Sequence, residues 1–352
     1  MDRSGDFLAH WQLKQSDTSP RAIVAFVHGF SDHCNAYYDF FPALASHGIE
    51  VRAFDQRGWG RSVTTPKQRG LTGPTSLVLS DIHSFLLSLV PLTKTASPSS
   101  PIPLFLMGHS MGGGEVLHYV LNPASPYHKQ FSSPNRGQDT VTLKGVLAFS
   151  PFVALHPSSR PLGITVVLGR LAGKLLPRFH LRNQLDPKFL CRDEKVCADY
   201  VADPLCHETG TLEGLAGLLD RAAWLEKLPA SSSSPSYAAA EEAVPPIWIG
   251  HGTDDRITSF DATKRFVDVL SARDKTFKVY EGAYHKLHAE PYNVKEQLVK
   301  DISDWILERS GTLVSSTSVD ENAAVSNTVD SSATEDQTQE VDNSTQNDKA
   351  KL

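Results

Sequence analysis

One serine of the sequence stands in the pattern that a catalytic nucleophile requires. Residues 108–112 read G-H-S-M-G, which fits G-x-S-x-G, and they come directly after the apolar run 103–107 and before a stretch with helical spacing. A tight strand-to-helix turn holds such a serine in a strained backbone and presents its hydroxyl clear of the sheet. The same turn places the amide of Met111 at a helix start, where N–H groups favour an anion. The pattern therefore predicts Ser110 as a nucleophile and Met111 as an oxyanion donor.

A serine hydroxyl is a poor nucleophile unless a histidine takes its proton and a carboxylate orients that histidine. Two loops after later apolar runs supply candidates in the order serine, aspartate, histidine. The first loop offers Asp254 and Asp255, and we predict Asp255 as the acid because Gly252-x-x-Asp255 leaves a turn before the carboxylate. Asp254 is the alternative. The second loop offers His285 and His288, and we predict His285 as the base.

A second oxyanion donor is predicted in the loop that follows the early apolar run Ile23–Val27. This loop begins H-G-F, and Gly29 lets the backbone turn sharply. The amide of Phe30 would then face that of Met111 across the developing negative charge. One such donor is worth roughly 3 kcal/mol of transition-state stabilisation.

Short apolar runs alternate with longer stretches of helical spacing between residues 20 and 310. The runs are rich in β-branched residues and predict buried strands at Ile23–Val27, Ile49–Phe54, Pro103–Met107, Val146–Phe149, Ile247–Ile249 and Thr276–Tyr280. The stretches between them predict helices at Tyr37–His47, Pro74–Val90, Gly112–Leu121, Phe260–Ser271 and Val294–Glu308. This alternation predicts an α/β fold with a mostly parallel central sheet flanked by helices.

The alternation breaks between Phe152 and about Ala240, which predicts an inserted helical cap. From residue 311 onward the chain is rich in Ser, Thr, Asn, Asp and Glu and has no aromatic residue, so we expect disorder there. The predicted organisation is a first part of the core at 1–151, a cap at 152–240, a second part of the core at 241–310 and an acidic tail at 311–352.

The composition excludes several classes of protein. Hydrophobic residues make up 40% and charged residues 21%, as in an ordinary globular chain rather than a collagen-like or wholly disordered one. The formal charge is −6, but the predicted tail holds eight acidic residues and two lysines, so residues 1–310 carry 32 acidic and 32 basic residues. Without a net basic field we expect no nucleic-acid partner. The four cysteines form no C-x-x-C pair and no zinc-type spacing, so neither a redox pair nor a metal site is expected.

The N-terminus predicts a cytoplasmic protein, because M-D-R-S-G-D has no apolar run behind it and resembles no secretory signal. No stretch approaches the roughly 18 consecutive apolar residues of a membrane span. The best candidate, Pro161–Gly169, is followed at once by Arg170. Any contact with a membrane is therefore expected to be peripheral.

Five separated motifs occur in order along the chain: H-G-F at 28–30, D-x-R-G-x-G-x-S at 55–62, G-H-S-M-G-G at 108–113, G-T-x-D at 252–255 and Y-E-G-A-Y-H-x-L-H at 280–288. Together they resemble the monoacylglycerol lipase family of α/β-hydrolases. Asp193 and the run D-P-L-C-H at 203–207 resemble that family's cap motif. The resemblance implies an α/β-hydrolase fold with Ser110 as nucleophile, Asp255 as acid and His285 as base.

The resemblance also implies that His109, Asp32 and His288 help to place the glycerol head group. One position departs from the family pattern, because animal members carry an arginine where this chain has Ala36. The surface excursions predicted at 122–140 and 230–243 are also long for the family.

The predicted activity is hydrolysis of monoacylglycerol to glycerol and free fatty acid through an acyl-Ser110 intermediate, with no cofactor and no metal. A broader carboxylesterase, lysophospholipase or thioesterase with the same triad is the alternative enzyme. A catalytically inactive lipid-surface binding protein is the alternative of another class.

The first cap segment is amphipathic: apolar residues between Leu162 and Leu176 fall largely on one face, and Arg170 and Lys174 lie on another. It either packs on its own domain or touches a lipid droplet or the endoplasmic reticulum membrane. If the cap covers Ser110, long acyl chains are favoured, because each buried methylene contributes roughly 0.8 kcal/mol.

Overall fold

The computed structural model describes residues 11–12, 19–94, 101–132, 140–160, 163–228 and 244–311. All of them belong to one structural unit, Met1–Leu313. The predicted tail beyond Gly311 and the whole of the predicted excursion at 230–243 lie outside the described residues.

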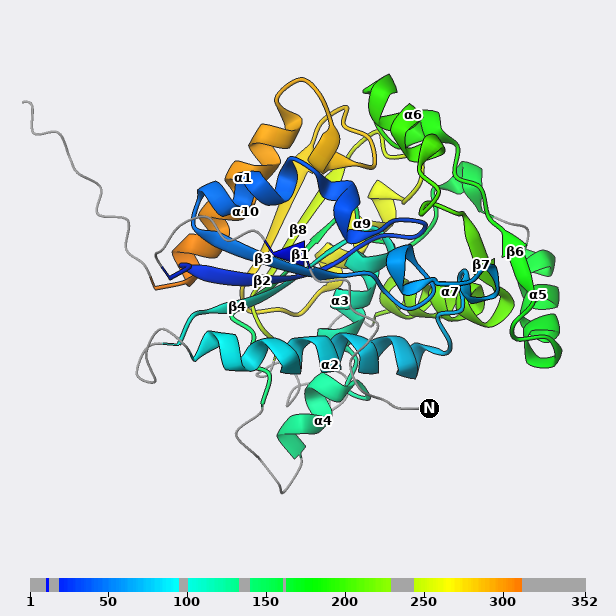
Figure 1. Cartoon of the computed structure of the whole chain (residues 1–352), viewed down its shortest axis with the longest axis horizontal. Coiled ribbons are helices and arrows are strands. Elements are labelled where there is room, and N and C mark those ends of the chain that lie inside the picture. Colours follow the sequence, from blue (N-terminus) through cyan, green and yellow to red (C-terminus); the bar gives the residue numbers. More distant parts are fainter. Residues whose placement is uncertain are drawn as a thin grey trace, which may run out of the picture. The chain divides into compact units, whose positions relative to one another are not determined.

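A seven-stranded sheet forms the centre of this unit (Figure 1). Its strands, in spatial order, are β1 (Trp11–Gln12), β3 (Ile49–Phe54), β2 (Ala22–Val27), β4 (Leu104–His109), β5 (Gly145–Phe149), β8 (Ile247–Gly252) and β9 (Lys275–Tyr280). Every neighbouring pair is parallel except β1 with β3. The predicted mostly parallel sheet is therefore confirmed. The edge strand β1 is not among the predicted strands, because two residues carry no periodic signal.

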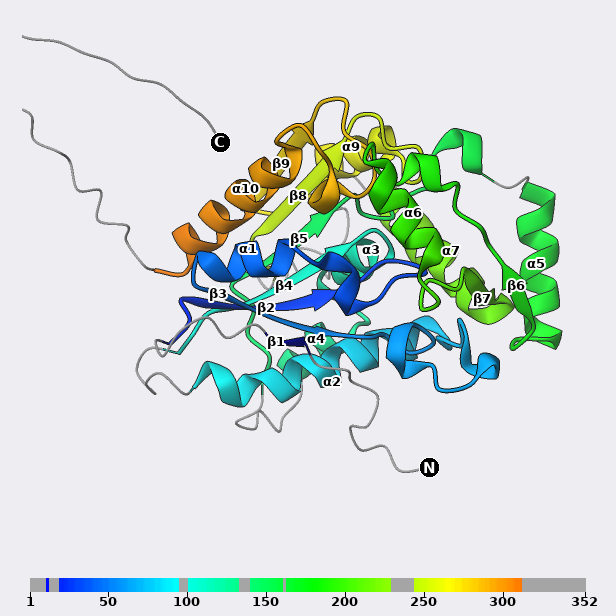
Figure 2. The same ribbon diagram turned by 45° about the horizontal axis from the view of Figure 1, so that its top comes forward.

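Helices cover both faces of the sheet, as Figures 1 and 2 show. One face carries α2 (Thr75–Thr93), α3 (Met111–Leu121) and α9 (Phe260–Val269), and the other carries α1 (Phe40–Ser46) and α10 (Val294–Arg309). Successive side chains of a strand point to opposite faces, so Ile23 of β2 packs in the first cluster and Val24 in the second. The near-continuous apolar runs of the sequence reflect this burial on both sides.

Helix α2 is long and apolar enough to cross a membrane by length and composition, and it alone meets that test within the described part of the chain. Its Ile82, Phe85 and Leu86 are fully buried in the cluster between the helices and the sheet. This is the burial of an amphipathic core helix in a globular domain.

The excursion predicted at 122–140 contains a helix that the sequence analysis does not predict, α4 (Pro126–Ser132), while 133–139 lie outside the described residues. Tyr127 is 3% exposed and packs edge-on against Phe131 with 5.3 Å between ring centroids. The side chain of Gln130 bonds the backbone N–H and C=O of Val141, both at 2.9 Å. A buried tyrosine and a side-chain amide thus order a stretch whose Pro, Ser and Asn content predicts a loop.

The segment between β5 and β8 forms a cap beside the carboxyl ends of the strands (Figure 2). Its elements are α5 (Gly163–Leu175), β6 (His180–Arg182), α6 (Glu194–Ala202), β7 (Thr209–Thr211) and α7 (Leu212–Glu226), and all fall within the predicted cap at 152–240. β6 and β7 pair as an antiparallel hairpin. α5 lies at the outer edge of the cap, and α7 lies between it and the sheet.

Polar and stacking contacts fix α7 and the turn before β7 to the core. Arg221 Nη2 of α7 lies 2.8 Å from Glu115 Oε1 of α3, and both side chains are at most 4% exposed. The ring of His207 stacks on Trp59 with 4.9 Å between centroids, and its Nε2 donates to the carbonyl oxygen of Gly58 at 3.1 Å. This part of the cap is therefore held against the core by a buried ion pair and by a half-buried histidine stacked on a buried tryptophan.

Candidate active site

Ser110 lies on the turn between β4 and α3, with a backbone φ of 55°. A positive φ is strained for a residue with a side chain, and such a turn lifts the hydroxyl clear of the sheet. The backbones on either side pass very close to one another. A Cβ at Gly108 would lie 2.3 Å from the carbonyl oxygen of Gly112, and one at Gly112 would lie 2.2 Å from that of Val27. The G-x-S-x-G spacing is thus imposed by backbone crowding around the serine.

His285 and Asp255 continue a hydrogen-bonded line that begins at Ser110. His285 follows β9 and Asp255 follows β8, so both come from the carboxyl edge of the sheet. His285 Nε2 lies 2.9 Å from Ser110 Oγ, and His285 Nδ1 lies 2.8 Å from Asp255 Oδ2. Because the carboxylate only accepts, Nδ1 carries the proton and Nε2 is left to accept from the serine hydroxyl. The structure thus brings together the three residues predicted as nucleophile, base and acid.

The alternative candidates in the same loops lie elsewhere. Asp254 is exposed, and its carboxylate accepts from Thr253 Oγ1 at 3.3 Å. His288 is buried against Tyr37 with 4.5 Å between ring centroids, and neither of its ring nitrogens has a hydrogen-bond partner within the described residues. Neither side chain takes part in the line that leads to Ser110.

Asp255 receives hydrogen bonds at both carboxylate oxygens. The amides of Ile257 and Thr258 donate to Oδ1 at 2.8 and 2.9 Å, and the Thr258 hydroxyl donates to Oδ2 at 2.7 Å. Nitrogens of His285 and His251 face Oδ2 at 2.8 and 3.1 Å. Burial alone raises the pKa of this carboxyl, but the histidines and hydrogen bonds together hold the pKa of Asp255 well below its ordinary value. Asp255 is therefore ionised at neutral pH. Thr258 and His251 are not among the predicted site residues.

The amides predicted as oxyanion donors come from two segments that meet at Ser110. Met111 is the first residue of α3, so its N–H has no acceptor inside the helix. Gly29 lets the other segment approach, since a Cβ at this position would lie only 3.2 Å from Ser110 Cβ. Phe30 and Met111 line the same cavity as Ser110. This placement suits the predicted oxyanion hole, whose action on a substrate stays a prediction.

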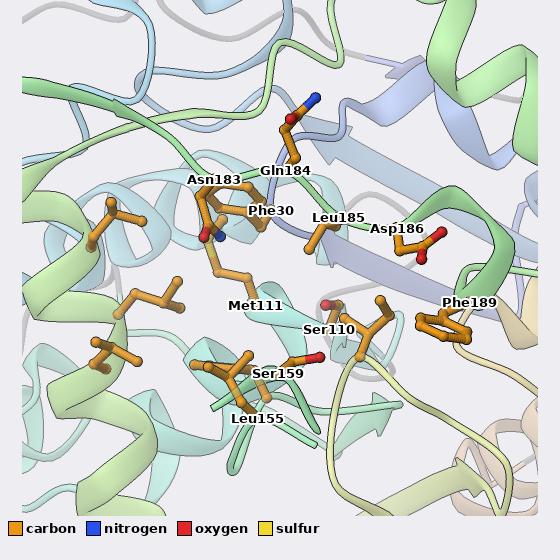
Figure 3. Close-up of a pocket in the computed structure, with 15 residues that line it drawn as sticks. Phe30, Ser110, Met111, Leu155, Ser159, Asn183, Gln184, Leu185, Asp186 and Phe189 are labelled. Atoms are coloured by element: carbon orange, nitrogen blue, oxygen red, sulfur yellow. The ribbon is translucent and has the colours of Figure 1, made fainter. Parts of the chain in front are cut away.

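A cavity of about 420 Å³ opens beside Ser110 (Figure 3). One wall comes from α7, where Leu215, Leu218 and Leu219 follow the spacing of a single helix face. Other apolar lining residues are Phe152, Leu155, Phe189 and Ile257, and the polar ones include Asn183 and Asp186. A mainly apolar cavity with a few polar groups suits a ligand with a hydrocarbon chain.

The three residues that the resemblance assigns to the head group do not line this cavity. They gather around Tyr37, whose hydroxyl lies 3.1 Å from Asp32 Oδ2 and 2.9 Å from His109 Nδ1 and whose ring packs on His288. His109 Nε2 donates to the carbonyl oxygen of His285 at 3.3 Å. Burial lowers the pKa of His109 and of His288, which keeps both rings neutral. Their contact with a head group stays a prediction.

One group of possible metal ligands occurs among the described residues, at the junction of core and cap. The ligand atoms of His33, Asp203 and Cys206 lie within 4.8 Å of one another, and His33 Nε2 is 2.8 Å from Asp203 Oδ2. His33 lies far from the other two along the chain, so no local metal-binding motif in the sequence predicts this group. Burial and the neighbouring Asp32 raise the pKa of the Cys206 thiol far above its ordinary value, so it remains protonated and is a weak metal ligand.

A mostly parallel sheet, a serine on a strained strand-to-helix turn and a cap inserted before the acid loop define an α/β-hydrolase. The chain belongs to the family described as serine aminopeptidase, S33, whose profile matches residues 18–292.

Similar proteins and structures indicate the kind of hydrolase. A Schizosaccharomyces pombe protein, provisionally named a monoglyceride lipase, is 34% identical over 292 residues that cover 83% of this chain and 68% of that protein. A monoacylglycerol lipase of Mycolicibacterium smegmatis is 30% identical over 292 residues, or 83% of this chain and 90% of that one. The crystal structure of a soluble variant of Saccharomyces cerevisiae monoglyceride lipase with a substrate analog matches at a TM-score of 0.71 and 25% identity, covering 87% of this chain and 92% of that chain. This chain is a serine ester hydrolase.

Proposed function

We propose that this chain hydrolyses monoacylglycerols to glycerol and free fatty acid through an acyl-Ser110 intermediate. The observation that carries the proposal is the line from Ser110 through His285 to Asp255, which opens onto a mainly apolar cavity of about 420 Å³. The names of the S. pombe, M. smegmatis and S. cerevisiae proteins support monoacylglycerol as the substrate.

In the proposed reaction His285 Nε2 takes the hydroxyl proton as Ser110 Oγ attacks the ester carbonyl carbon. The amides of Phe30 and Met111 stabilise the negative charge on the carbonyl oxygen. The ester C–O bond then breaks, and His285 gives its proton to the departing glycerol oxygen. Next His285 takes a proton from water, whose oxygen attacks the acyl carbon, and the Ser110–acyl bond breaks as the proton returns to Oγ. Asp255 stays ionised throughout and stabilises the His285 imidazolium.

The cavity favours long acyl chains over short ones in this proposal. The leucines of α7 form one of its walls, and each methylene that a chain buries there contributes roughly 0.8 kcal/mol. A short ester would engage Ser110 and forgo most of that contribution.

Fatty-acid release from 1-oleoylglycerol by the purified protein tests the proposal, with Ser110→Ala, dioleoylglycerol and a short-chain nitrophenyl ester in parallel. We expect release that disappears in Ser110→Ala and little activity on dioleoylglycerol. Cleavage of the nitrophenyl ester alone would contradict monoacylglycerol as the substrate but would leave the proposed triad in place. No activity on any of the three, together with failure of a fluorophosphonate probe to label Ser110, would contradict the enzyme mechanism as well.

We further propose peripheral contact with a lipid droplet or the endoplasmic reticulum membrane through the outer edge of the cap, in a cytoplasmic protein. The support is an exposed apolar set at the end of α5 and just beyond it, which we name the cap patch: Leu171, Leu175, Leu176 and Phe179, each 53–83% exposed. Arg170, Lys174 and Arg178 flank it and are exposed, and Arg170 is paired with Asp220. An apolar surface bordered by cations is the pattern of an interfacial helix.

A further inference from the structure

A second histidine contacts the acid of the proposed triad. His251 is the fifth residue of β8, is 0% exposed, and places Nε2 3.1 Å from Asp255 Oδ2. The same oxygen lies 2.8 Å from His285 Nδ1 and 2.7 Å from Thr258 Oγ1. Two imidazole rings therefore share one carboxylate oxygen, and only one of them reaches Ser110.

The surroundings of His251 determine which ring nitrogen carries the proton. Nε2 lies between Asp255 Oδ2 and Thr258 Oγ1, the latter at 3.2 Å. The single hydroxyl proton of Thr258 points along its shortest contact, the 2.7 Å bond to Asp255, so Nε2 meets only acceptors and must be the N–H. Nδ1 is buried without a partner within the described residues, and the His251 ring lies perpendicular to the Phe260 ring with 5.9 Å between centroids. His251 thus donates from Nε2 to Asp255.

We propose that His251 is a positioning residue that sets how strongly Asp255 stabilises protonated His285, an inference that rests on the proposed function. The His251 N–H withdraws electron density from the oxygen that His285 uses and fixes the carboxylate in one orientation. The titratable groups in contact with Asp255 are these two histidines, and its other donors are the uncharged amides of Ile257 and Thr258 and the Thr258 hydroxyl.

This arrangement has a consequence for the pH dependence of the reaction. With the His251 bond present, Asp255 is a weaker acceptor and stabilises the His285 imidazolium less. The acidic limb of kcat/KM therefore lies at a lower pH than it would without that bond. Loss of one neutral hydrogen bond to the carboxylate would move that limb upward by roughly half a pH unit to one unit.

The test is kcat/KM on a soluble nitrophenyl ester from about pH 5 to about pH 9 for the parent, His251→Leu and His251→Gln. We expect the acidic limb of His251→Leu to move to higher pH, and that of His251→Gln, which keeps an N–H donor, to stay near the parent. His118→Leu is the control, because His118 is also a buried histidine with an unpartnered Nδ1 but lies on α3 away from Asp255. Equal limbs in parent and His251→Leu, or equal displacement in the Leu and Gln variants, would overturn the proposal.

A second measurement separates this inference from the proposed function and does not require a folded leucine variant. Nitrogen-15 NMR of ring-labelled Ser110→Ala protein reports the tautomer of each histidine without any turnover. We expect His251 to be protonated at Nε2 and bare at Nδ1 near neutral pH. A proton on Nδ1 would overturn the proposal even if the parent protein hydrolyses monoacylglycerol. If His251 has the expected tautomer but the parent protein shows no esterase activity, only the proposed function is contradicted.

Discussion

At the scale of single residues, the turn that carries Ser110 depends on neighbouring glycines, which have no side chain. The elbow brings α3 so close to β2 that a Cβ at Gly112 would lie 2.2 Å from the carbonyl oxygen of Val27 and 2.5 Å from that of His28. Both contacts are with backbone atoms, which cannot move aside as a flexible side chain does. The loop that follows His28 carries the predicted oxyanion donor Phe30, so crowding at Gly112 acts directly on the site.

We therefore expect Gly112→Ala to lose at least about 100-fold in kcat/KM, because misplacing reacting groups by about 1 Å has a cost of that order. Gly169→Ala is the matched control, since Gly169 lies in helix α5 and a Cβ there meets nothing within 4 Å. The control should keep its activity and gain up to about 1 kcal/mol of stability from helix propensity. Ester hydrolysis and thermal unfolding of both variants check this, and near-parent activity of Gly112→Ala would show that the turn relaxes.

Sequence reasoning identifies the residues of the candidate site whose identity is set by chemistry and by motif. Ser110, Asp255 and His285 follow from a strained turn and from the order of loops along the chain. Thr258 and His251 do not, because their contact with Asp255 depends on how β8 is oriented and on the turn that follows it. The near-continuous apolar run of a strand buried on both faces gives no alternation from which that orientation could be predicted.

At the scale of elements, α7 has two roles on two faces. One face carries Leu215, Leu218 and Leu219 into the cavity. The other carries Arg221, whose guanidinium contacts Glu115 at 2.8 Å and donates to Thr75 Oγ1 at 3.2 Å. Since Glu115 lies about one turn after Ser110 on α3, this buried pair fixes the distance between α3 and a wall of the cavity.

The losses from removing the two partners of this pair should not be additive. Arg221→Met and Glu115→Leu each leave an uncompensated polar group buried, and we expect each to lose about 3 kcal/mol of unfolding free energy. The double variant should lose clearly less than the sum, and the single variants should show a lower preference for oleoyl over hexanoyl monoglyceride. Urea unfolding and the ratio of kcat/KM values measure both effects. Additive losses would mean that the pair does not couple the two helices.

Glu115 also predicts a pH dependence of stability. Burial raises the pKa of Glu115 from 4.5 to about 7, although Arg221 opposes the rise. A carboxyl that binds its proton more tightly in the folded state contributes stability that is fully present below pH 4.5 and is lost as the pH rises through about 7. Glu115→Gln does not titrate, so its Tm relative to the parent should improve between about pH 5 and about pH 8.5. Calorimetric Tm values at these two pH values test this, and Glu296→Gln, at an exposed position, is the control. A Tm of Glu115→Gln that falls relative to the parent as the pH rises would contradict the prediction.

The elements themselves are predictable where burial imposes a long apolar pattern and unpredictable where few residues or single contacts decide. The six predicted strands are all present in the sheet. Each of the five stretches predicted as helical contains a helix. β1 has two residues, and α4 depends on the burial of Tyr127 and on the amide of Gln130. Such contacts come from the tertiary fold and leave no local signal.

At the scale of the folded unit, the two edges of the cap differ in how they contact the rest. The edge formed by α7 and the preceding turn is joined to the core by Arg221, His207 and buried main-chain bonds such as Thr211 N–H to the carbonyl oxygen of Gly70. The outer edge carries the cap patch, whose Leu175 is 83% exposed. Amphipathic spacing alone leaves both interpretations of the first cap segment open, and the exposure of its last turn favours contact with a lipid surface.

The last prediction concerns this outer edge. Each leucine of the cap patch that enters a lipid surface contributes about 2 kcal/mol, so Leu171→Asp with Leu175→Asp should weaken vesicle binding by at least about tenfold per position. Tyr292→Asp is the matched control, because Tyr292 is 77% exposed but lies before α10 and outside the cap. Flotation with vesicles that contain anionic lipid, at low and high salt, measures binding. Lys174 and Arg178 should make this binding salt-dependent. Hydrolysis of a soluble ester should be the same in the parent and both variants, which shows that the variants are folded. Equal flotation of the double variant and the parent would place membrane contact elsewhere on the chain.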